Sequence, residues 1–270
     1  MTTRADLDVT DTADWAGRPL GEREVSWDER DAILFALAVG APAERVDLVF
    51  ERDLKVLPTF ALTLAQWAPD VLGSAGAFDV GTALHGSQRL EVLAPMPPSG
   101  ATLMQARVGN VWDKGAAAVF EVVVECEYVR ATWSIFAPGR GGFGGERGPG
   151  RTSGPEGDPI ATVGLDVAAN AAALYRLTGD RHHIHIDPVA AERIGQPRPI
   201  LHGLATLSAA VLAAADAQGA SPADLTLLEG RFSSPVFPGE HLTVPVWADG
   251  SFRVDTGRGT AIDGARALFA

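Results

Sequence analysis

Residues 175–188 read YRLTGDRHHIHIDP and contain three of the six histidines in the chain. Glycine tolerates the left-handed backbone conformation that commonly ends a helix, so Gly179 is expected to end a helix over 168–177. Asp180 then opens a non-helical loop that carries the histidines. This stretch is therefore the strongest candidate in the sequence for a site of chemistry.

The residue types in this loop suit acid–base chemistry. From His183 to Asp187, a strand-like alternation would place His183, His185 and Asp187 on one side. Asp180 and His185 are five residues apart on a bent loop, so they can converge on one water molecule. Their ordinary pKa values of about 3.9 and 6.5 suit a base and an acid or base at neutral pH. We therefore expect Asp180 and His185 to act together.

Hydropathy periodicity predicts the same order of elements in both halves of the chain. Helices are expected over 27–39, with Ser26 as the N-cap, and over 168–177 and 202–217. The strands that are expected to follow lie at 87–93, 101–111 and 117–133, and at 225–232, 241–248 and 251–256. Helices followed by strands, twice over, indicate an α+β fold rather than a βαβ arrangement.

The middle of the chain is rich in glycine, proline and arginine. Residues 137–158 read APGRGGFGGERGPGRTSGPEGD, a composition typical of an exposed linker. A dinucleotide-binding glycine loop would need a helix after it, and Pro149 and Pro155 argue against one. We therefore predict a first half over 1–136, a linker over 137–158 and a second half over 159–270.

Composition and charge exclude several classes of protein. The chain has 270 residues, 46% of them hydrophobic, and a formal net charge of −12 at pH 7. An acidic chain without a basic stripe binds nucleic acid poorly, and no apolar stretch reaches the ~20 residues of a membrane span. The start of the sequence, 1–14, does not resemble a signal peptide, and the lone Cys126 suits a reducing compartment. We expect a cytoplasmic protein with neither nucleic-acid nor membrane partners.

The histidine-rich stretch resembles the hydratase 2 motif of the MaoC-like (R)-specific enoyl-CoA hydratases, a family that includes the hydratase part of peroxisomal multifunctional enzyme type 2. The positions that match this motif are Tyr175, Leu177, Thr178, Gly179, Asp180, His185, Asp187, Pro188, His202 and Gly203. Further matches lie at 231–232 and 235–239 in the second half, and at 37–40, 57–60 and 113–115 in the first. The resemblance therefore covers nearly the whole chain.

This resemblance implies a double hot-dog fold, in which each half is an antiparallel sheet wrapped around a long helix. It implies that Asp180 and His185 hold and activate a water that adds to a trans-2-enoyl-CoA, giving the (3R)-3-hydroxyacyl-CoA. Gly203 would offer its backbone N–H to the thioester oxygen, a role that suits the start of a helix. The substrate would be carried as a CoA thioester with no further cofactor and no metal, and a homodimer is expected.

Two positions depart from the family motif, because His182 and His183 stand where the family has Asn and Pro. His182 is expected beside the substrate, where it can donate a hydrogen bond as Asn does, but it also titrates. His202 is expected either to orient the loop before the second long helix or to take part in the chemistry. Asp187 is expected to cap a short helix over 189–194.

The first half has no counterpart of the acid–base pair. Gly40-Ala41 stands where the second half has Gly179-Asp180, so one active site per chain is expected. The helix predicted in the first half is rich in small and apolar residues over 32–40. It would leave a slot for the acyl tail, which favours medium, long or bulky acyl chains.

The phosphates of CoA require positive charge near them. The candidate residues for this contact are Lys114, Arg140, Arg198 and Arg231. The sequence does not choose among these four side chains.

Two other readings remain open from the residues. His183, His185 and Asp187 spell His-x-His-x-Asp, which resembles the start of the zinc signature of metallo-β-lactamase folds. That signature continues with a histidine where this chain has Pro188, and downstream only His202 and His241 could add imidazole ligands. The third reading is a non-catalytic acyl-CoA-binding hot-dog protein, in which the two departures from the motif have removed the activity.

Overall fold

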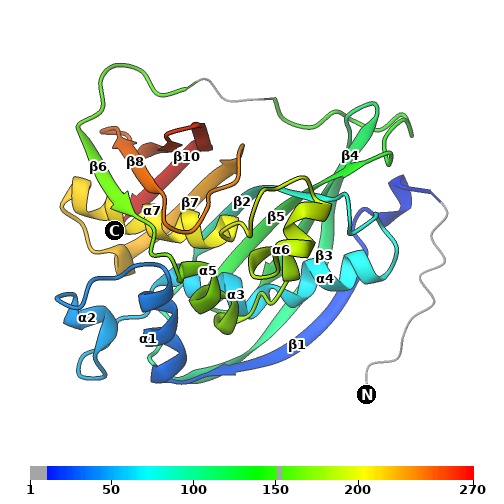
Figure 1. Cartoon of the computed structure of the whole chain (residues 1–270). Helices are drawn as coiled ribbons and strands as arrows, with labels where there is room; N and C mark the ends of the chain where they lie inside the picture. The colour runs from blue at the N-terminus through cyan, green and yellow to red at the C-terminus, as the bar shows by residue number, and fades with distance from the viewer. Residues whose placement is uncertain (1–10, 151–153) are drawn as a thin grey trace.

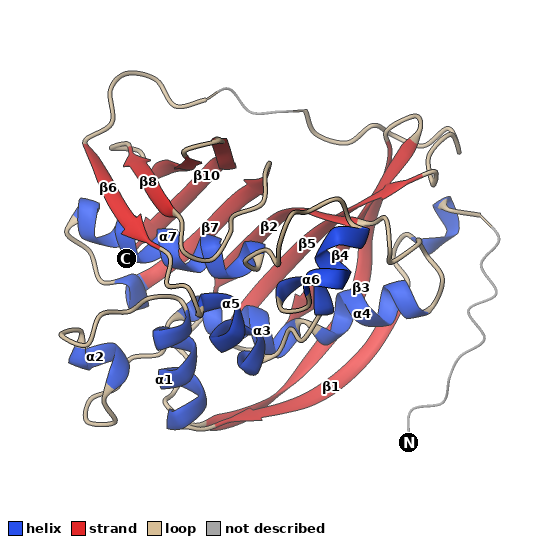
Figure 2. Cartoon of the chain, in the orientation of Figure 1, coloured by secondary structure: helices blue, strands red, loops and turns tan. Residues whose placement is uncertain are grey.

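The computed structural model describes residues 11–150 and 154–270, which form one curved ten-stranded sheet with helices on one face (Figures 1 and 2). The strand order is β1-β3-β4-β5-β2-β7-β10-β9-β8-β6, and every neighbouring pair is antiparallel. The strands of the first half are β1 (Pro19–Trp27), β2 (Leu84–Val92), β3 (Gly100–Asp113), β4 (Ala117–Glu125) and β5 (Val129–Pro138). Those of the second are β6 (Ala161–Asp166), β7 (Leu225–Phe232), β8 (His241–Val246), β9 (Ser251–Thr256) and β10 (Gly259–Phe269).

Both halves repeat one order of elements. An edge strand is followed by a short helix, α1 (Glu29–Ala38) in the first half and α5 (Ala171–Tyr175) in the second. A longer helical segment then packs on the sheet: α3 (Ala61–Ala65) with α4 (Trp67–Ser74) in the first half, and α7 (Gly203–Gln218) in the second. Four strands complete each half, and β2 pairs with β7 where the halves meet. The expected α+β double hot-dog fold is confirmed. Two shorter helices, α2 (Val46–Val49) and α6 (Pro188–Arg193), lie in the loops that precede the longer segments.

The helix α7 is the centre of the second half. Every residue from Leu204 to Ala215 is buried, because small and aliphatic side chains on all sides of the helix let the sheet close around it. The helix ends at Gly219, which has a positive φ of 66° and therefore a backbone conformation that favours glycine.

The first helix of the chain differs from its prediction. It begins at Glu29 rather than at 27, and Asp28 caps it by a capping box with Asp31, so the predicted cap Ser26 lies in β1. The helix that the first sheet wraps is also a different one, formed by α3 and α4. This helical segment was not predicted, because Pro69 argued against a helix there. Proline is, however, tolerated in the first turn of a helix, and Pro69 lies in the first turn of α4.

Several strands were predicted well, and others were missed. The predictions for β7 and β9 match their bounds, whereas the predicted strand at 117–133 is wrong, since two strands, β4 and β5, form a hairpin there. The edge strands β1 and β6 and the last strand β10 were not predicted. Because β1 has mostly exposed residues, it carries no strong hydropathy alternation.

Part of the glycine-rich middle is held against the first half. The Asp113 carboxylate accepts hydrogen bonds from the backbone N–H groups of Gly115, Gly142 and Gly144, at 2.8–3.0 Å. At Gly141 a Cβ would lie only 2.3 Å from two backbone carbonyl oxygens, so only glycine fits. This part of the predicted linker is therefore anchored on the β3–β4 turn rather than freely exposed. Residues 151–153 of the predicted linker lie outside the described part of the chain, as do residues 1–10.

None of the helices in the described ranges has the length and apolar character that a membrane crossing requires.

Candidate active site

The histidine-rich loop lies against a helix of the first half. After α5, a 3-10 turn over Arg176–Thr178 leads into Gly179. A Cβ at Gly179 would lie 3.0 Å from the carbonyl oxygen of Thr63 in α3, so glycine allows this close approach. The loop that follows is thereby placed at the junction of the two halves.

The predicted alternation of His183, His185 and Asp187 is wrong. His183–His185 form a 3-10 turn and α6 starts at Pro188, so His183 is exposed while His185 is buried. The Oδ1 of Asp187 accepts the N–H of Val189 at 2.9 Å, which confirms its prediction as a helix cap. A proline in the first turn and an aspartate before it favour a helix start here over an extended strand.

His185 has a fixed orientation. Its Nδ1 lies 2.9 Å from the carbonyl oxygen of Ile200 and donates to it, since a carbonyl can only accept. The proton is then on Nδ1, and Nε2 is an acceptor that faces Oδ2 of Asp180 at 3.9 Å. Burial lowers the pKa of His185, although the Asp180 charge opposes this, so the ring is neutral at pH 7.

Asp180 has one engaged and one free carboxylate oxygen in the described structure. Oδ1 accepts the backbone N–H of His182 at 2.9 Å, and Oδ2 faces His185. The 3.9 Å gap is too long for a direct hydrogen bond, but a water oxygen at about 2.8 Å from both atoms would bridge it. With its side chain 28% exposed, Asp180 is open to solvent on one side.

His202 packs directly on His185. The two rings are stacked, with centroids 3.6 Å apart and an interplanar angle of 23°, and Tyr175 lies on the ring of His202 at 4.7 Å. Nε2 of His202 donates to the backbone oxygen of Asp180 at 3.1 Å. Burial, and after it the proximity of His185, lower the pKa of His202 to about 3. This neutral ring therefore holds the main chain of Asp180 and one face of His185.

Gly203 lies at the start of α7. As the first residue of the helix its N–H has no intrahelical acceptor, and the helix dipole adds partial positive charge there. A Cβ at this position would lie 3.0 Å from two ring carbons of Phe232 at the end of β7. The aromatic ring therefore packs directly against the Gly203 backbone.

His182 lies at the exposed edge of this group. Its ring centroid is 6.3 Å from that of His185, and its Nδ1 accepts the N–H of Ile184 at 3.4 Å. The structure thus brings together Asp180, His182, His185 and His202, with Gly203 next in the chain.

The basic residues that were candidates for CoA contacts lie apart from this group. Nζ of Lys114 contacts the backbone oxygen of Arg147, on the β3–β4 turn. Arg231 pairs with Asp263 at 2.8 Å, on the sheet face opposite to Gly230 and α7. Arg198 is exposed in the loop that leads to α7, where it donates to the backbone oxygen of Pro238 at 3.0 Å.

The structure does not bring together the ligands that were predicted for a metal site. His183 and Asp187 do not join His185, and His241 instead lies 2.7 Å from Asp166 on an exposed edge of the sheet. A different trio, Asp180, His185 and His202, has ligand atoms within 4.8 Å of one another. The nitrogen lone pairs of these stacked imidazoles lie in two nearly parallel ring planes with centroids 3.6 Å apart, which is a poor arrangement for two ligands of one tetrahedral ion.

Two side chains of the first half were missed as neighbours of the site. Asp70 on α4 has a raised pKa, first through desolvation and then through the charge of Asp180. His85 on β2 contacts Phe232, with ring centroids 4.7 Å apart. The LHG triplet at 84–86 was visible in the sequence, but its partner is evident only once β2 pairs with β7.

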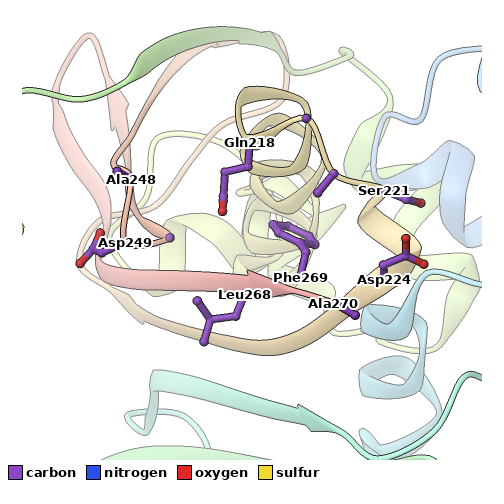
Figure 3. A pocket seen from close by; sticks show the side chains of 11 residues that line it. Gln218, Ser221, Asp224, Ala248, Asp249, Leu268, Phe269 and Ala270 are labelled. Atoms are coloured by element: carbon purple, nitrogen blue, oxygen red, sulfur yellow. The ribbon is translucent and has the colours of Figure 1, made fainter.

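Two cavities flank α7. One, of about 280 Å³, lies between α1, β6, α5 and α7, and its lining is mostly apolar. It includes Leu201 and Ala205, on either side of the Gly203 turn, and residues 37–40 from the first half. The other, of about 510 Å³, lies at the far end of the same helix (Figure 3). Its lining runs from Gln218 to the last strand and contains none of the predicted site residues.

Comparison with known families divides the chain at the same place as the fold. Residues 25–136 match the MFE-2 hydratase 2 N-terminal domain, and residues 152–265 match the MaoC like domain.

Individual relatives resemble the chain over nearly its whole length. Enoyl-CoA hydratase ChsH3 of Mycobacterium tuberculosis is 40% identical, over 91% of this chain and 90% of its own. The full-length peroxisomal multifunctional enzyme type 2 of Drosophila melanogaster is 31% identical with a TM-score of 0.75, over 93% of this chain and 48% of that one. A MaoC-like dehydratase from Phytophthora capsici has the same fold, with a TM-score of 0.83 at 24% identity, over 94% of this chain and 96% of that chain.

Proposed function

Because the chain belongs to the MaoC-like dehydratase family, with an MFE-2 hydratase 2 N-terminal domain ahead of its MaoC-like domain, we propose that Asp180 and His185 hold the water that adds to a trans-2-enoyl-CoA. The chain is an enoyl-CoA hydratase of the hydratase 2 type, a hydro-lyase. The roles of individual residues, the (3R) product and the preferred acyl chain are our proposals.

The observation that carries the mechanism is the 3.9 Å separation of Asp180 Oδ2 and His185 Nε2. Both atoms are acceptors, because the proton of His185 is on Nδ1 and donates to Ile200. A water between them must donate both of its protons, which leaves its lone pairs free to attack C3 of the enoyl group. One of the two acceptors takes a proton as the C3–O bond forms, and that proton then passes to C2.

We assign Gly203 to the thioester oxygen, at the other end of the conjugated enoyl thioester from C3. As the hydroxyl adds to C3, negative charge moves onto the thioester oxygen, and the resulting enolate requires a hydrogen-bond donor. The N–H at the start of α7 supplies one, together with the partial positive charge of the helix. A single donor of this kind contributes roughly 10²–10³-fold to a rate. His202 holds the backbone of Asp180 and stacks on His185, so we assign it to orienting the pair rather than to proton transfer.

The apolar cavity of about 280 Å³ is our candidate for the acyl tail. It starts beside the Gly203 turn and extends to residues 37–40, so the first half supplies part of its wall. Each methylene that is buried there contributes about 0.8 kcal/mol. We therefore propose a preference for medium, long or bulky acyl chains over the four-carbon crotonyl group.

Arg198 is our candidate for a contact to CoA. It is exposed beside the helix that begins at Gly203, and its described hydrogen bond goes to a neutral carbonyl rather than to a carboxylate. Its charge therefore remains available to a phosphate. Arg231, by comparison, is already paired with Asp263.

We also propose that the enzyme is a cytoplasmic homodimer. The free Cys126 suits a reducing compartment. Because relatives such as enoyl-CoA hydratase 2 of Arabidopsis thaliana are named peroxisomal, localisation of a tagged full-length chain is the test of the first part. Sedimentation velocity tests the second.

The proposed function is tested by mixing the purified protein with enoyl-CoA thioesters in the presence of a chelator. We expect the absorbance of the conjugated enoyl group to fall at a rate proportional to enzyme concentration. Unchanged absorbance, with the thioester bound, would instead support the non-catalytic acyl-CoA-binding protein. Activity that the chelator abolishes and zinc restores would support the metal reading.

A further inference from the structure

A bulge in β2, the strand of the first half that pairs with the second half, re-directs one side chain. In the pairing of β2 with β5, His85 lies opposite Ile135 and Ser87 lies opposite Ser134, so Gly86 is the extra residue. Directly paired residues of an antiparallel sheet share a face, and Ile135 is buried on the face that carries the helices. Without the bulge, Leu84, which is exposed, would occupy this face in place of His85.

The bulge depends on glycine and on a local hydrogen bond. A Cβ at Gly86 would lie 3.2 Å from the carbonyl oxygen of Ser134, which is closer than most side chains tolerate. Nε2 of His85 donates to the carbonyl oxygen of Ser87 at 3.1 Å, on the other side of the bulge. The imidazole plane is therefore fixed by the strand that carries it.

His85 then contacts the ring that packs on Gly203. The imidazole and Phe232 meet edge to face, with centroids 4.7 Å apart and an interplanar angle of 60°. Phe232 also lies so close to Gly203 that an added Cβ would be 3.0 Å from its ring. A continuous contact thus runs from β2 of the first half, through the end of β7, to the N–H at the start of α7.

Hydrogen-bond donors to a developing enolate act through exact placement, and a misplacement of about 1 Å can cost about 10²-fold in rate. We propose that His85 is a positioning residue for the hydration reaction: it holds Phe232 against Gly203 and so fixes the direction of the Gly203 N–H toward the thioester oxygen. This inference rests on the proposed function, and it gives the first half a part in the chemistry of the second.

The electrostatics of His85 agree with such a role. Burial lowers the pKa of this ring to about 4, so it is neutral at neutral pH. A neutral ring adds no positive charge near Asp180 and leaves the acid–base pair undisturbed.

Three variants of the full chain test the proposal. His85→Ala removes the support of Phe232, and His85→Phe restores an aromatic ring. His241→Ala is the matched control, because this exposed histidine lies on β8, next to the edge strand β6 and away from β2. We expect His85→Ala to lower kcat about 10-fold, a fraction of the contribution of one oxyanion donor, with KM changed less than about two-fold. His85→Phe should recover most of kcat, and His241→Ala should match the unmodified enzyme.

A spectroscopic measurement separates positioning from general loss of structure. Hexanoyl-CoA is saturated and cannot be hydrated, so the stretching frequency of its bound thioester carbonyl reports the hydrogen bond from Gly203 directly. We expect this frequency to be lowered on binding to the unmodified protein and to His241→Ala. The lowering should be smaller in His85→Ala, and it should return in His85→Phe, which also serves if the alanine variant does not fold.

The results distinguish this inference from the proposed function. If the unmodified enzyme hydrates enoyl-CoA but His85→Ala keeps both kcat and the carbonyl shift, the positioning role is wrong and the hydratase assignment stands. Additive losses of kcat from His85→Ala and Phe232→Leu would also contradict it, because residues that act through one contact should show non-additive effects. If the unmodified enzyme has no activity, the proposed function itself fails.

Discussion

The two halves of the sheet share one order of elements, yet they begin their long helical segments differently. In the second half, the loop before α7 carries Asp180 and His185, and the helix starts with a glycine whose N–H has no acceptor within the helix. In the first half, the loop carries the short helix α2, and a proline and a buried phenylalanine, Pro58 and Phe60, precede α3. We therefore propose that the second half holds the catalytic residues, while the first half forms walls and contacts around them.

The largest difference between the halves should appear when the acid–base pair is removed. Asp180→Asn and His185→Gln should each lower kcat at least about 10²-fold, because general acid–base catalysis contributes roughly 10²–10⁴-fold. Enoyl-CoA kinetics and thermal unfolding measure the effects on rate and on folding. Asp187→Asn and His183→Gln are the matched controls, since one keeps the cap of α6 and the other changes an exposed ring. A variant of Asp180 or His185 with more than about a tenth of normal activity would contradict the pair.

The activity should be nearly as sensitive to a substitution at the start of α7. Gly203→Ala places a Cβ 3.0 Å from Phe232, so either the ring or the helix start must shift. We expect kcat to fall about 10- to 100-fold, within the range for one oxyanion donor. Gly257→Ala, in a turn of the same half with no atom within 4 Å of the added Cβ, should have no effect. Equal activities of the two variants would remove Gly203 from the mechanism.

The sequence was most informative where a motif carries its own local geometry. The prediction that Asp180 and His185 lie close together is confirmed, because the glycine, the proline and the cap in their shared loop specify its turns locally, and α7 starts at Gly203, within one residue of its prediction. The hydropathy alternation of β7 and β9 was equally local.

The features that were missed depend on contacts between distant segments. β1 is a strand because it pairs with β3, not because of its own pattern. His85 and Phe232 are 147 positions apart, and the bulge at Gly86 decides which face His85 occupies. The hydropathy pattern of a single segment does not predict its contacts with a distant segment. The contact of Gly179 with Thr63 could not be predicted for the same reason.

The contribution of the first half should appear in how kcat/KM depends on the length of the acyl chain. We expect kcat/KM to rise with chain length above four carbons by up to about four-fold per methylene, since each contributes about 0.8 kcal/mol. Ala38→Leu, which narrows the cavity from the first half, should flatten this rise and leave the crotonyl ester unaffected. Ala101→Leu, on an exposed face of β3, is the control. A flat profile in the unmodified enzyme would contradict the acyl cavity, though not the hydratase assignment.

Each half contains a desolvated, neutral histidine, half-buried in the first half and buried in the second, and stability should therefore depend on pH. His85 and His202 have pKa values of about 4 and about 3 in the folded protein, against about 6.5 when unfolded. The unfolded chain binds more protons between these values, so the free energy of unfolding should decrease as the pH falls below about 6.5. The expected slope is about 1.4 kcal/mol per pH unit for each histidine. Urea unfolding at pH 7 and pH 5 measures this slope. His85→Phe should remove the contribution of one histidine, and an unchanged slope would contradict the lowered pKa of His85.

The smallest expected effect is at His182. If this side chain replaces the asparagine of the family only sterically, His182→Asn should keep or raise kcat, because its backbone N–H to Asp180 is retained. Comparing kcat across pH distinguishes this from a working histidine. A lower kcat together with the loss of one ionisation from the pH profile would assign His182 a part in proton transfer.

The central claim is that the Asp180–His185 pair in the second half adds water to an enoyl-CoA to give the (3R) alcohol. The most direct measurement couples hydration of trans-2-decenoyl-CoA to a dehydrogenase specific for either the (3R)- or the (3S)-hydroxyacyl-CoA, and follows NADH. We predict NADH formation with the (3R)-specific dehydrogenase only, and its loss in His185→Gln but not in His183→Gln. NADH formation with the (3S)-specific dehydrogenase, or equal activity of the two histidine variants, would contradict the account.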